Sequence, residues 1–595
     1  MVFCSNTTSQ TAVFENFGDK DEHLGAIIDE IRSVESLDSK ELERIQRLYP
    51  KEGKGFYSKR EILSAFRTSY SENLTESEIS KFTRKLQTCP TRSLSGVLPV
   101  TVLTKPFPCP GRCVFCPSDV QMPKSYLSKE PGCQRASHNR FDPYLQAWNR
   151  LSSYRDMGHP TDKVELIILG GTWSYYSKEY RRWFIGSLLK ALNDFGSNVD
   201  ERSTIAEFTA NFPEAKDPGD FRGRYNRQVR TVLRTHHEGV LTADWEDCPQ
   251  EKLTELSSVN EGAGSRCVGI SIETRPDAVD EAELVFLRNL GVTKVQIGVQ
   301  SLSDKVLSLN RRGHNAETSR RALSLLRAAG FKVQVHWMVN LLGGNPSDDL
   351  EDFKNLFDDK FARPDELKLY PCSLIESAEL VDHYKRGEWV PYEREELEQL
   401  LLDCLAIVPP TCRVTRVIRD IPSTDIPVGN KRTNLREDVE RRARSAGVTL
   451  NEIRNREVRT LPTVRSDLKL IDRVYKAGYG VEHFLEWNDT KDRIAAFLRL
   501  YLPLETPPIS ELAGSAIIRE VHVYGRSTAL GDRSENSVQH AGLGRELVKR
   551  AEEISLQNGF CSLAVISAVG TRKYYESLGF KKGVLYQFLD LKQDC

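Results

Sequence analysis

No run of apolar residues in this chain is long enough to span a membrane, and its first residues, MVFCSNTTSQ, lack the apolar stretch of a secretory signal. The chain also lacks an excess of charge of either sign, because 83 Lys and Arg residues face 84 Asp and Glu residues. We find no internal repeat and no low-complexity tract. With 39% hydrophobic and 28% charged residues, the composition is that of a soluble globular protein with several domains.

The 13 cysteines occur without a secretory start. In a reducing compartment such thiols serve ligation or packing rather than disulfide bonding. We therefore expect a cytoplasmic protein without membrane association.

Three of the cysteines lie close together in the run KPFPCPGRCVFCP, at Cys109, Cys113 and Cys116. This C-x3-C-x2-C spacing places three thiolates on one short loop, where they can hold three irons of a 4Fe–4S cluster and leave the fourth iron without a protein ligand. S-adenosylmethionine (SAM) can bind at that open iron. The alternatives are a zinc knuckle or loop cysteines without a role. Zinc requires a fourth Cys or His at similar spacing, and none is obvious, so the spacing favours the cluster.

Positive charge is concentrated locally, although the whole chain is nearly neutral. Residues 81–140 hold ten Lys and Arg residues against two acids, and residues 431–460 hold nine against five. A basic stretch around the cysteine loop favours a polyanionic substrate. The alternative is a solvated surface whose acids come from other parts of the fold.

Helical patterns near 23–33, 39–48, 58–70 and 75–87 predict a small helical module over 21–95, after a disordered stretch at 1–20. Two of these helices begin with capping boxes, Ser58–Glu61 and Thr75–Glu78, in which a hydroxyl and a carboxylate satisfy free amide groups. The last helix of the module is basic.

From about residue 96 the pattern alternates between strands and helices, which predicts an α/β fold with buried parallel strands. Candidate strands lie at 96–104, 164–170, 204–211, 267–273, 294–300, 331–339 and 366–370. Six or seven strands fit a partial (β/α) TIM-type barrel over 96–404, with catalytic residues at the C-terminal ends of the strands.

The remaining segments complete the domain prediction. The polar stretch 186–265 predicts a loop-rich insertion, and a Pro-rich, then basic segment at 405–465 predicts a linker domain. Residues 466–595 predict a second α/β domain.

A second chemical motif lies in this last domain. Gln539, Gly542 and Gly544 form Q-x-x-G-x-G directly before an amphipathic helix, and a strand-like run at 517–525 precedes them. Glycines at a helix start let backbone amides approach a pyrophosphate closely, where the helix dipole favours negative charge. The alternative is a Rossmann-like turn without a ligand.

The cysteine loop resembles that of the radical SAM superfamily, and the glycine turn resembles the acetyl-CoA site of GNAT acetyltransferases. Together they resemble the catalytic subunit of Elongator and its bacterial and archaeal relatives, the tRNA carboxymethyluridine synthases. The supporting runs include TKPFPCPGRCVFCP (104–117), ELIILGGTW (165–173), GISIETRPD (269–277), RRGHN (311–315), REVHVYG (519–525), QHAGLG (539–544) and VGTRKYYESLGF (569–580).

The resemblance implies a role for particular residues. Cys109, Cys113 and Cys116 would bind the cluster, and the residues implied in SAM binding are Gly170, Gly171, Thr172, Glu273 and Arg275. The implied acetyl-CoA contacts are Lys163, Glu520, Val521, His522, Val523, Val538, Gln539, His540, Gly542, Gly544, Tyr574 and Tyr575. Catalytic roles would fall to Lys163, Glu520, His522 and Tyr575.

Several of these assignments have a plainer structural alternative, and Tyr575 by itself would be a packing residue. Glu273 and Arg275 would then only pair with each other, and Gly170 and Gly171 would form an ordinary turn. Lys163 would be a solvated charge.

The resemblance also implies the reaction. SAM-derived radical chemistry would join the acetyl group of acetyl-CoA to the five-position of the wobble uridine in a tRNA anticodon, and thioester hydrolysis, with water activated by Glu520 or His522, would leave a carboxymethyl group. This requires the cysteine trio to lie within reach of the bound thioester. The module at 21–95 would bind tRNA, and accessory subunits of an Elongator-like complex are further expected partners.

Two other functions stay open from the sequence. One is a protein lysine acetyltransferase with a structural iron–sulfur cluster, and the other is a non-catalytic tRNA-binding scaffold. Many bacterial and archaeal relatives carry a cysteine cluster just before the REV run. Here the corresponding stretch, NEIRNREV (451–458), has no cysteine, so we predict no structural zinc.

Overall fold

The computed structural model describes residues 22–51, 55–71, 74–88, 95–209, 224–236, 243, 246–459, 465–524 and 542–591. The stretch 1–20, predicted to be disordered, lies outside them. Among the described helices, none combines the length and the apolar character needed to cross a bilayer.

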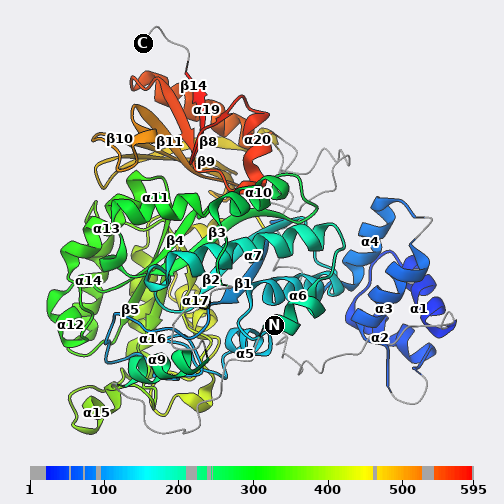
Figure 1. Cartoon of the computed structure of the whole chain (residues 1–595), viewed down its shortest axis with the longest axis horizontal. Helices are drawn as coiled ribbons and strands as arrows, with labels where there is room; N and C mark the ends of the chain where they lie inside the picture. Colours follow the sequence, from blue (N-terminus) through cyan, green and yellow to red (C-terminus); the bar gives the residue numbers. More distant parts are fainter. Residues whose placement is uncertain are drawn as a thin grey trace.

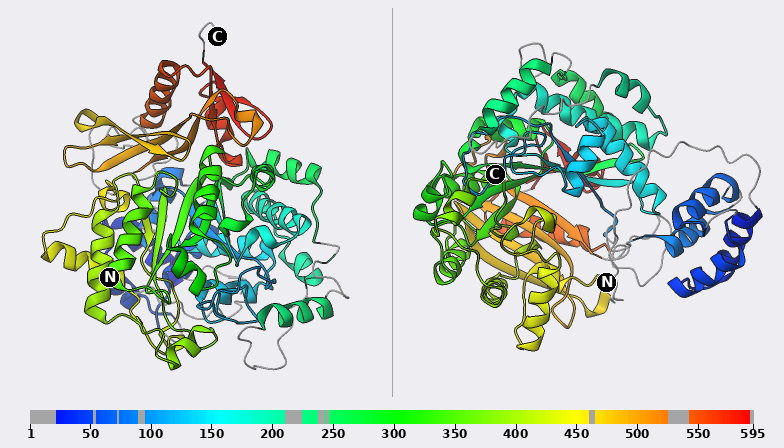
Figure 2. Two further views of the ribbon diagram at one scale, coloured as in Figure 1. Left: turned by 90° about the vertical axis from the view of Figure 1, so that its left-hand side faces the viewer. Right: turned by 90° about the horizontal axis from the view of Figure 1, so that it is seen from below.

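The N-terminal module is helical, as the sequence predicts, and lies to one side of the molecule (Figures 1 and 2). It consists of α1 (Glu22–Ser33), α2 (Ser39–Leu48), α3 (Lys59–Ala65), a π-helical turn (Phe66–Tyr70) and α4 (Glu76–Leu86). Both capping boxes are confirmed. The helices share a small apolar core of their own.

The first sheet has seven parallel strands that lie in sequence order. They are β1 (Leu98–Leu103), β2 (Lys163–Leu169), β3 (Arg266–Thr274), β4 (Lys294–Gln300), β5 (Lys332–Val339), β6 (Glu366–Pro371) and β7 (Arg413–Arg416). Because β1 and β7 do not pair with each other, the sheet forms an open, partial barrel. The predicted α/β class is confirmed.

Side-chain alternation gives this sheet an apolar outer face and a polar inner face. In β2, Val164, Leu166 and Ile168 are fully or almost fully buried, whereas Lys163 and Glu165, on the other face of the strand, are half-buried. The apolar outer face packs against helices in one large core. The covering helices include α6 (Pro143–Asp156), α7 (Lys178–Gly196), α10 (Gln250–Asn260), α11 (Glu281–Asn289), α13 (Ala316–Ala328), α14 (Pro346–Asp358), α16 (Arg394–Ile407) and α17 (Leu435–Ser445).

Six of the seven predicted strands are confirmed, and the seventh is wrong. Of the predicted strand 204–211, residues 204–208 belong to α8 (Arg202–Phe208), and 210–211 lie outside the described residues. Arg202 of this helix stacks 3.8 Å from the Trp148 ring centroid of α6, which ties the segment to the helical layer. The place beside β2 is taken by β3.

The insertion at 186–265 is more helical than predicted. Its described residues include the end of α7, then α8, α9 (Tyr225–His236) and α10. The segment 405–465 contributes β7 to the barrel sheet, α17 to its core, and the short α18 (Ile453–Arg456).

The second sheet also has seven strands, in the order β13-β14-β12-β11-β10-β9-β8. They are β8 (Lys469–Ala477), β9 (Gly480–Asn488), β10 (Ile494–Pro503), β11 (Ser515–Val523), β12 (Ser562–Val565), β13 (Lys581–Lys582) and β14 (Gln587–Asp590). Among the described strands of this sheet, β11 and β12 are the one pair that runs in parallel. The helices α19 (Leu543–Gln557) and α20 (Arg572–Glu576) complete this unit.

This second unit lies at the N-terminal ends of the barrel strands (Figure 1). A Cβ atom on Gly570 would stand 2.7 Å from Cβ of Arg266, where β3 begins. The Tyr586 hydroxyl donates a hydrogen bond to the carbonyl of Ala329, just before β5. The C-terminal ends of the barrel strands are at the opposite side of the sheet.

Candidate active site

The cysteine loop follows β1 and lies at the C-terminal ends of the barrel strands. Cys113 is buried, Cys109 and Cys116 are half-buried, and all three are free thiols. The Cys116 sulfur lies 2.9 Å from the Ser125 hydroxyl, and the Cys109 sulfur lies 3.6 Å from the Thr172 hydroxyl. The loop therefore sits where catalytic groups of such barrels are found.

Two arginines face the Cys113 sulfur. Arg312 Nη1 is 3.0 Å from it and Arg275 Nη1 is 3.9 Å from it. The hydrogen bond with Cys116 and these two guanidinium groups hold the pKa of Cys113 well below its usual range. Thiolate, rather than thiol, is the form that binds metals.

This donor set fits an iron–sulfur cluster. Among the described residues, no three His, Cys, Asp or Glu side chains converge as ligands of a single metal ion. In a 4Fe–4S cluster each thiolate binds a different iron, so three sulfurs spaced around a loop suffice. The two cations beside Cys113 would also offset the negative charge of thiolate ligands.

Gly170, Gly171 and Thr172 lie next to the cysteine loop, as the resemblance implies. Gly170 and Gly171 have φ of +131° and +84°. A Cβ atom on Gly170 would stand 1.9 Å from Oγ1 of Thr104, so only glycine fits here. The two glycines thus bring Thr172 to the sulfur of Cys109.

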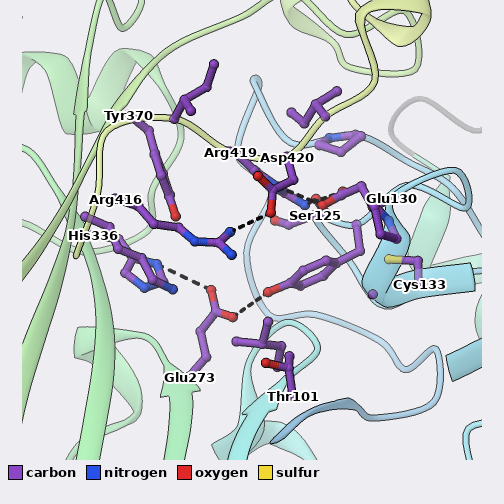
Figure 3. A pocket seen from close by; sticks show the side chains of 18 of the residues that line it. Thr101, Ser125, Glu130, Cys133, Glu273, His336, Tyr370, Arg416, Arg419 and Asp420 are labelled. Carbon is purple, nitrogen blue, oxygen red and sulfur yellow. Dashed lines mark hydrogen bonds and ion pairs between the residues drawn. The ribbon is translucent and has the colours of Figure 1, made fainter. Parts of the chain in front are cut away.

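Glu273 and Arg275 do not pair with each other, so that structural alternative is wrong. Glu273 accepts a hydrogen bond from the Tyr126 hydroxyl at 2.7 Å and lies 3.4 Å from His336 (Figure 3). Burial and nearby cations hold the pKa of His336 well below its usual value, so this imidazole is neutral. Arg275 donates two hydrogen bonds to Asp277, at 2.8 and 2.9 Å.

A cavity of about 560 Å³ opens beside Cys116 inside the barrel (Figure 3). Its polar lining comes mostly from the C-terminal halves of the strands and includes Glu273, Gln300, His336, Lys368, Tyr370 and Arg416. Burial lowers the pKa of Lys368 to about 8. Such a cavity, with convergent charged groups, is suited to a polar small molecule or a nucleobase.

The expected acetyl-CoA residues of the second sheet also come together in part. Val523 of β11 and Tyr574 of α20 both adjoin Gly544, since a Cβ atom there would stand 3.6 and 3.0 Å from their nearest atoms. Gly542 begins α19 with φ of +73°. Tyr574 is half-exposed and Tyr575 is buried against Phe580. The expected contacts Val538, Gln539 and His540 lie outside the described residues.

Glu520 and His522 of β11 differ in their electrostatics. Burial opposes ionisation of Glu520, but Lys332 at 2.5 Å and Arg499 at 3.1 Å outweigh it and lower the pKa of this carboxyl. Burial lowers the pKa of His522 to about 4, so its imidazole is neutral. Its ring stacks on Phe497, with 5.8 Å between centroids.

Lys163 is the first residue of β2 and lies at the barrel end that faces the second sheet. Its register partner on β3 is Arg266, beside Gly570. Lys163 therefore lies near the second sheet, and far from the cysteine loop.

The two candidate centres lie at opposite ends of the barrel. β5 runs from Lys332, which contacts Glu520, to Val339 near the cavity, a length of about 25 Å for eight residues. No residue of the second sheet lines the cavity beside Cys116. We expected the cysteine trio to lie within reach of the thioester. Among the described residues, however, no cavity joins the trio to the acetyl-CoA residues.

The barrel interior between these centres is polar. At the end near the second sheet, Lys332 pairs with Glu366 at 2.7 Å and Lys294 pairs with Glu165 at 2.8 Å. Nearer the cavity, the Gln296 amide oxygen accepts a hydrogen bond from Lys368. Sequence reasoning missed these groups, although their alternation along each strand is visible in the sequence.

Much of the local positive charge is neutralised within the fold. In the basic stretch 81–140, Lys105 is buried against Glu246, Lys129 pairs with Asp425, and Lys85 donates hydrogen bonds to carbonyls at the end of α1. In the stretch 431–460, Arg436 pairs with Glu452 of the same stretch, and Arg456 pairs with Glu486 of β9. Local charge counts therefore overstated the basic surface at Lys105 and Lys129, whose partner acids lie far along the chain.

Comparisons with known proteins agree with this architecture. The family model described as the Radical SAM superfamily matches residues 244–359, and the Radical_SAM C-terminal domain matches residues 364–445. The barrel is thus of the radical SAM class.

Relatives extend the similarity to almost the whole chain. A tRNA uridine(34) acetyltransferase of Dehalococcoides mccartyi is 36% identical, over 84% of this chain and 99% of the relative. One of Methanocaldococcus infernus is 35% identical over 95% of this chain and 98% of the relative. The Elongator complex protein 3 of Homo sapiens is 33% identical over 84% of each chain.

A solved structure resembles the whole architecture as well. The archaeal Methanocaldococcus infernus Elp3 with an N-terminal deletion superposes with a TM-score of 0.65 and 33% identity, over 84% of this chain and 100% of that chain. The chain belongs to the family of tRNA uridine(34) acetyltransferases and Elongator complex protein 3.

Proposed function

We propose that this protein modifies the wobble uridine of tRNA, using a 4Fe–4S cluster, SAM and acetyl-CoA to place a carboxymethyl group on its five-position. The observation that carries the proposal is the cysteine trio at the C-terminal end of a radical SAM barrel that shares its chain with an acetyltransferase-like sheet. The names of the relatives support the same substrate. When bound, the cluster and SAM supply radical chemistry, and acetyl-CoA supplies the two-carbon unit.

The residues divide between the two ends of the barrel. Cys109, Cys113 and Cys116 hold the cluster. Gly170 to Thr172 and Glu273 position SAM beside the cluster. Arg275 binds the carboxylate of SAM only if the two hydrogen bonds between Arg275 and Asp277 break. At the other end, the acetyl-CoA residues are Lys163, Val521, Val523, Val538, Gln539, His540, Gly542, Gly544, Tyr574 and Tyr575.

Within that site we assign separate tasks to the two polar residues of β11. Glu520 fixes β11 to Lys332 of the barrel. We assign to His522 the activation of water for thioester hydrolysis, because its imidazole is neutral and, among the described residues, accepts no competing hydrogen bond; its pKa of about 4 makes it a weak base at neutral pH. We further propose cytoplasmic action, a tRNA-binding role for the module at 21–95, and accessory subunits as partners.

The cluster is tested by iron and sulfide analysis of anaerobically purified protein. We expect about four irons per chain in the wild type and their loss in Cys116→Ala. Cys133→Ala is the matched control, since Cys133 is also a free cysteine on the wall of the same cavity but outside the trio. It should keep the irons.

The activity has its own test. Reduced wild-type protein with SAM, acetyl-CoA and tRNA should form carboxymethyluridine, and Cys113→Ser should form none. Product from Cys113→Ser would rule out the proposal. Acetylation of protein lysines without SAM would support the acetyltransferase alternative, and tRNA binding without SAM cleavage would support the scaffold.

A further inference from the structure

The helix α9 lies in the insertion and packs against the cysteine loop, at the end of the barrel opposite the second sheet (Figure 1). Its inner face is apolar, because Tyr225, Val229 and Leu233 are buried in the barrel core. The spacing of these residues, four apart, leaves the other face of the helix toward solvent.

Two side chains of α9 hold the cysteine loop directly. The Asn226 side chain accepts a hydrogen bond from the Cys109 amide at 2.9 Å and donates one to the Cys109 carbonyl at 2.7 Å. The Tyr225 hydroxyl donates to the Met122 carbonyl at 2.8 Å. Whatever binds the outer face of α9 is therefore separated from the backbone of Cys109 by the thickness of one helix, about 10 Å.

The outer face of α9 is strongly basic. Its sequence, YNRQVRTVLRTH, contains no acid, and Arg227, Arg230 and Arg234 follow one side of the helix. Arg227 and Arg234 are exposed and Arg230 is half-exposed. Within the described part of the chain, none of these three guanidinium groups has a carboxylate partner, in contrast to the neutralised cations of the stretch 81–140.

Two further exposed groups lie on or beside the cysteine loop. Arg112 is exposed between two of the cluster cysteines. Tyr175 is 41% exposed, and its ring packs edge-on against Phe107, with 6.4 Å between centroids. The Phe107 carbonyl oxygen in turn lies 3.4 Å from the Tyr225 hydroxyl, which links Tyr175 to α9.

Unpaired arginines combined with an exposed aromatic ring are the features that bind single-stranded nucleic acid. Guanidinium groups bind phosphates, and bases stack on aromatic side chains. We propose that Arg112, Arg227, Arg230, Arg234 and Tyr175 form the contact surface for the single-stranded loop of the RNA substrate. The inference rests on the proposed function and adds a role for the insertion: α9 holds the cluster loop on one face and the RNA on the other.

The charge component is tested by tRNA affinity of the full chain across a salt series. In the triple variant Arg227→Gln, Arg230→Gln, Arg234→Gln we expect at least about tenfold weaker binding. The slope of log K against log salt should fall in magnitude by about 2, since each phosphate contact of a single strand contributes about 0.7. The matched control Arg321→Gln, Lys469→Gln, Lys476→Gln removes three exposed cations on α13 and β8 and should bind as the wild type does.

The stacking component has a different signature. Tyr175→Ser should weaken binding roughly tenfold without changing the salt slope, and Tyr175→Phe should restore the affinity.

The outcomes separate the two proposals. Unchanged affinity and slope in the α9 triple variant, or an equal loss in the control, would overturn the α9 surface and leave the proposed function standing. Failure of the wild-type protein to bind tRNA at all would overturn both.

Discussion

Burial acts on two neighbouring side chains of β11 with opposite results. Glu520 keeps its charge because Lys332 and Arg499 surround it, whereas for His522 burial outweighs the nearby Glu520 carboxylate and the imidazole loses its proton. A carboxylate tied to two cations has its lone pairs engaged, whereas the His522 imidazole keeps a free nitrogen lone pair, although its pKa of about 4 makes it a weak base. Cys113 resembles Glu520 in this respect, because Arg312 and Arg275 favour its negatively charged thiolate despite burial.

The His522 assignment predicts a particular pH dependence of acetyl-CoA hydrolysis. Because the pKa of His522 is lowered to about 4, the imidazole is already unprotonated at pH 6, and the rate should be flat from pH 6 to pH 8. His522→Gln should reduce the rate roughly 100-fold or more.

Glu520→Gln is the companion variant. It should mainly lower the thermal unfolding midpoint, because it leaves Lys332 and Arg499 without this carboxylate. If the rate of acetyl-CoA hydrolysis by the wild type fell as the pH was lowered, with a midpoint near pH 6.5, the assignment of His522 as the base would be contradicted.

At the scale of elements, the cysteine loop has little regular structure of its own and depends on its neighbours. β2 supplies the glycine turn that brings Thr172 to Cys109, and α9 supplies the two hydrogen bonds of Asn226. Groups beyond the direct ligands commonly tune metal affinity about tenfold or more. The positioning of the loop by α9 should therefore be measurable.

We expect Asn226→Ala to assemble a cluster and to lose its iron to a chelator roughly tenfold faster than the wild type. The reason is the loss of both hydrogen bonds to the backbone of Cys109. Gln228→Ala, on the same helix and without such a contact among the described residues, is the control and should retain iron normally. Equal iron loss from both variants would mean that Asn226 does not position the loop.

For the whole molecule, a buried charge network joins the barrel to the second sheet. Asp365, which is fully buried, pairs with Arg519 at 2.5 Å and Arg327 at 3.3 Å, and Glu482 of β9 pairs with the same two arginines. Burial opposes the charge on Asp365, but these arginines hold its pKa well below the usual range. The buried carboxylates of Asp365, beside the barrel sheet, and Glu482, in the second sheet, are thus neutralised by the same two arginines.

Removing one member should therefore be costly. Asp365→Asn leaves buried arginines without their carboxylate and should destabilise the protein by about 3–5 kcal/mol, seen as a lower thermal unfolding midpoint. Asp590→Asn breaks an exposed pair with Lys581 and should change stability by less than about 1 kcal/mol. If the two variants melted alike, the network would not be what secures the interface.

The sequence alone determined the features that depend on near neighbours. The cysteine spacing, the capping boxes and six barrel strands all follow from residues a few positions apart, which is the range over which thiol spacing and side-chain alternation act. The strand predicted at 204–211 failed because β-branched residues favour strands only weakly, and packing of Arg202 on Trp148 fixed a helix there instead. β7 is only four residues long and was missed.

Only the tertiary structure decided which distant groups meet. Arg312 reaches Cys113 across 199 positions, and Asn226 reaches Cys109 across 117. Acids far along the chain neutralise cations that local counting had assigned to the surface, and the second sheet docks at the barrel end away from the cysteines. Such contacts depend on shape and charge complementarity between whole elements, and no local pattern in the chain encodes that complementarity.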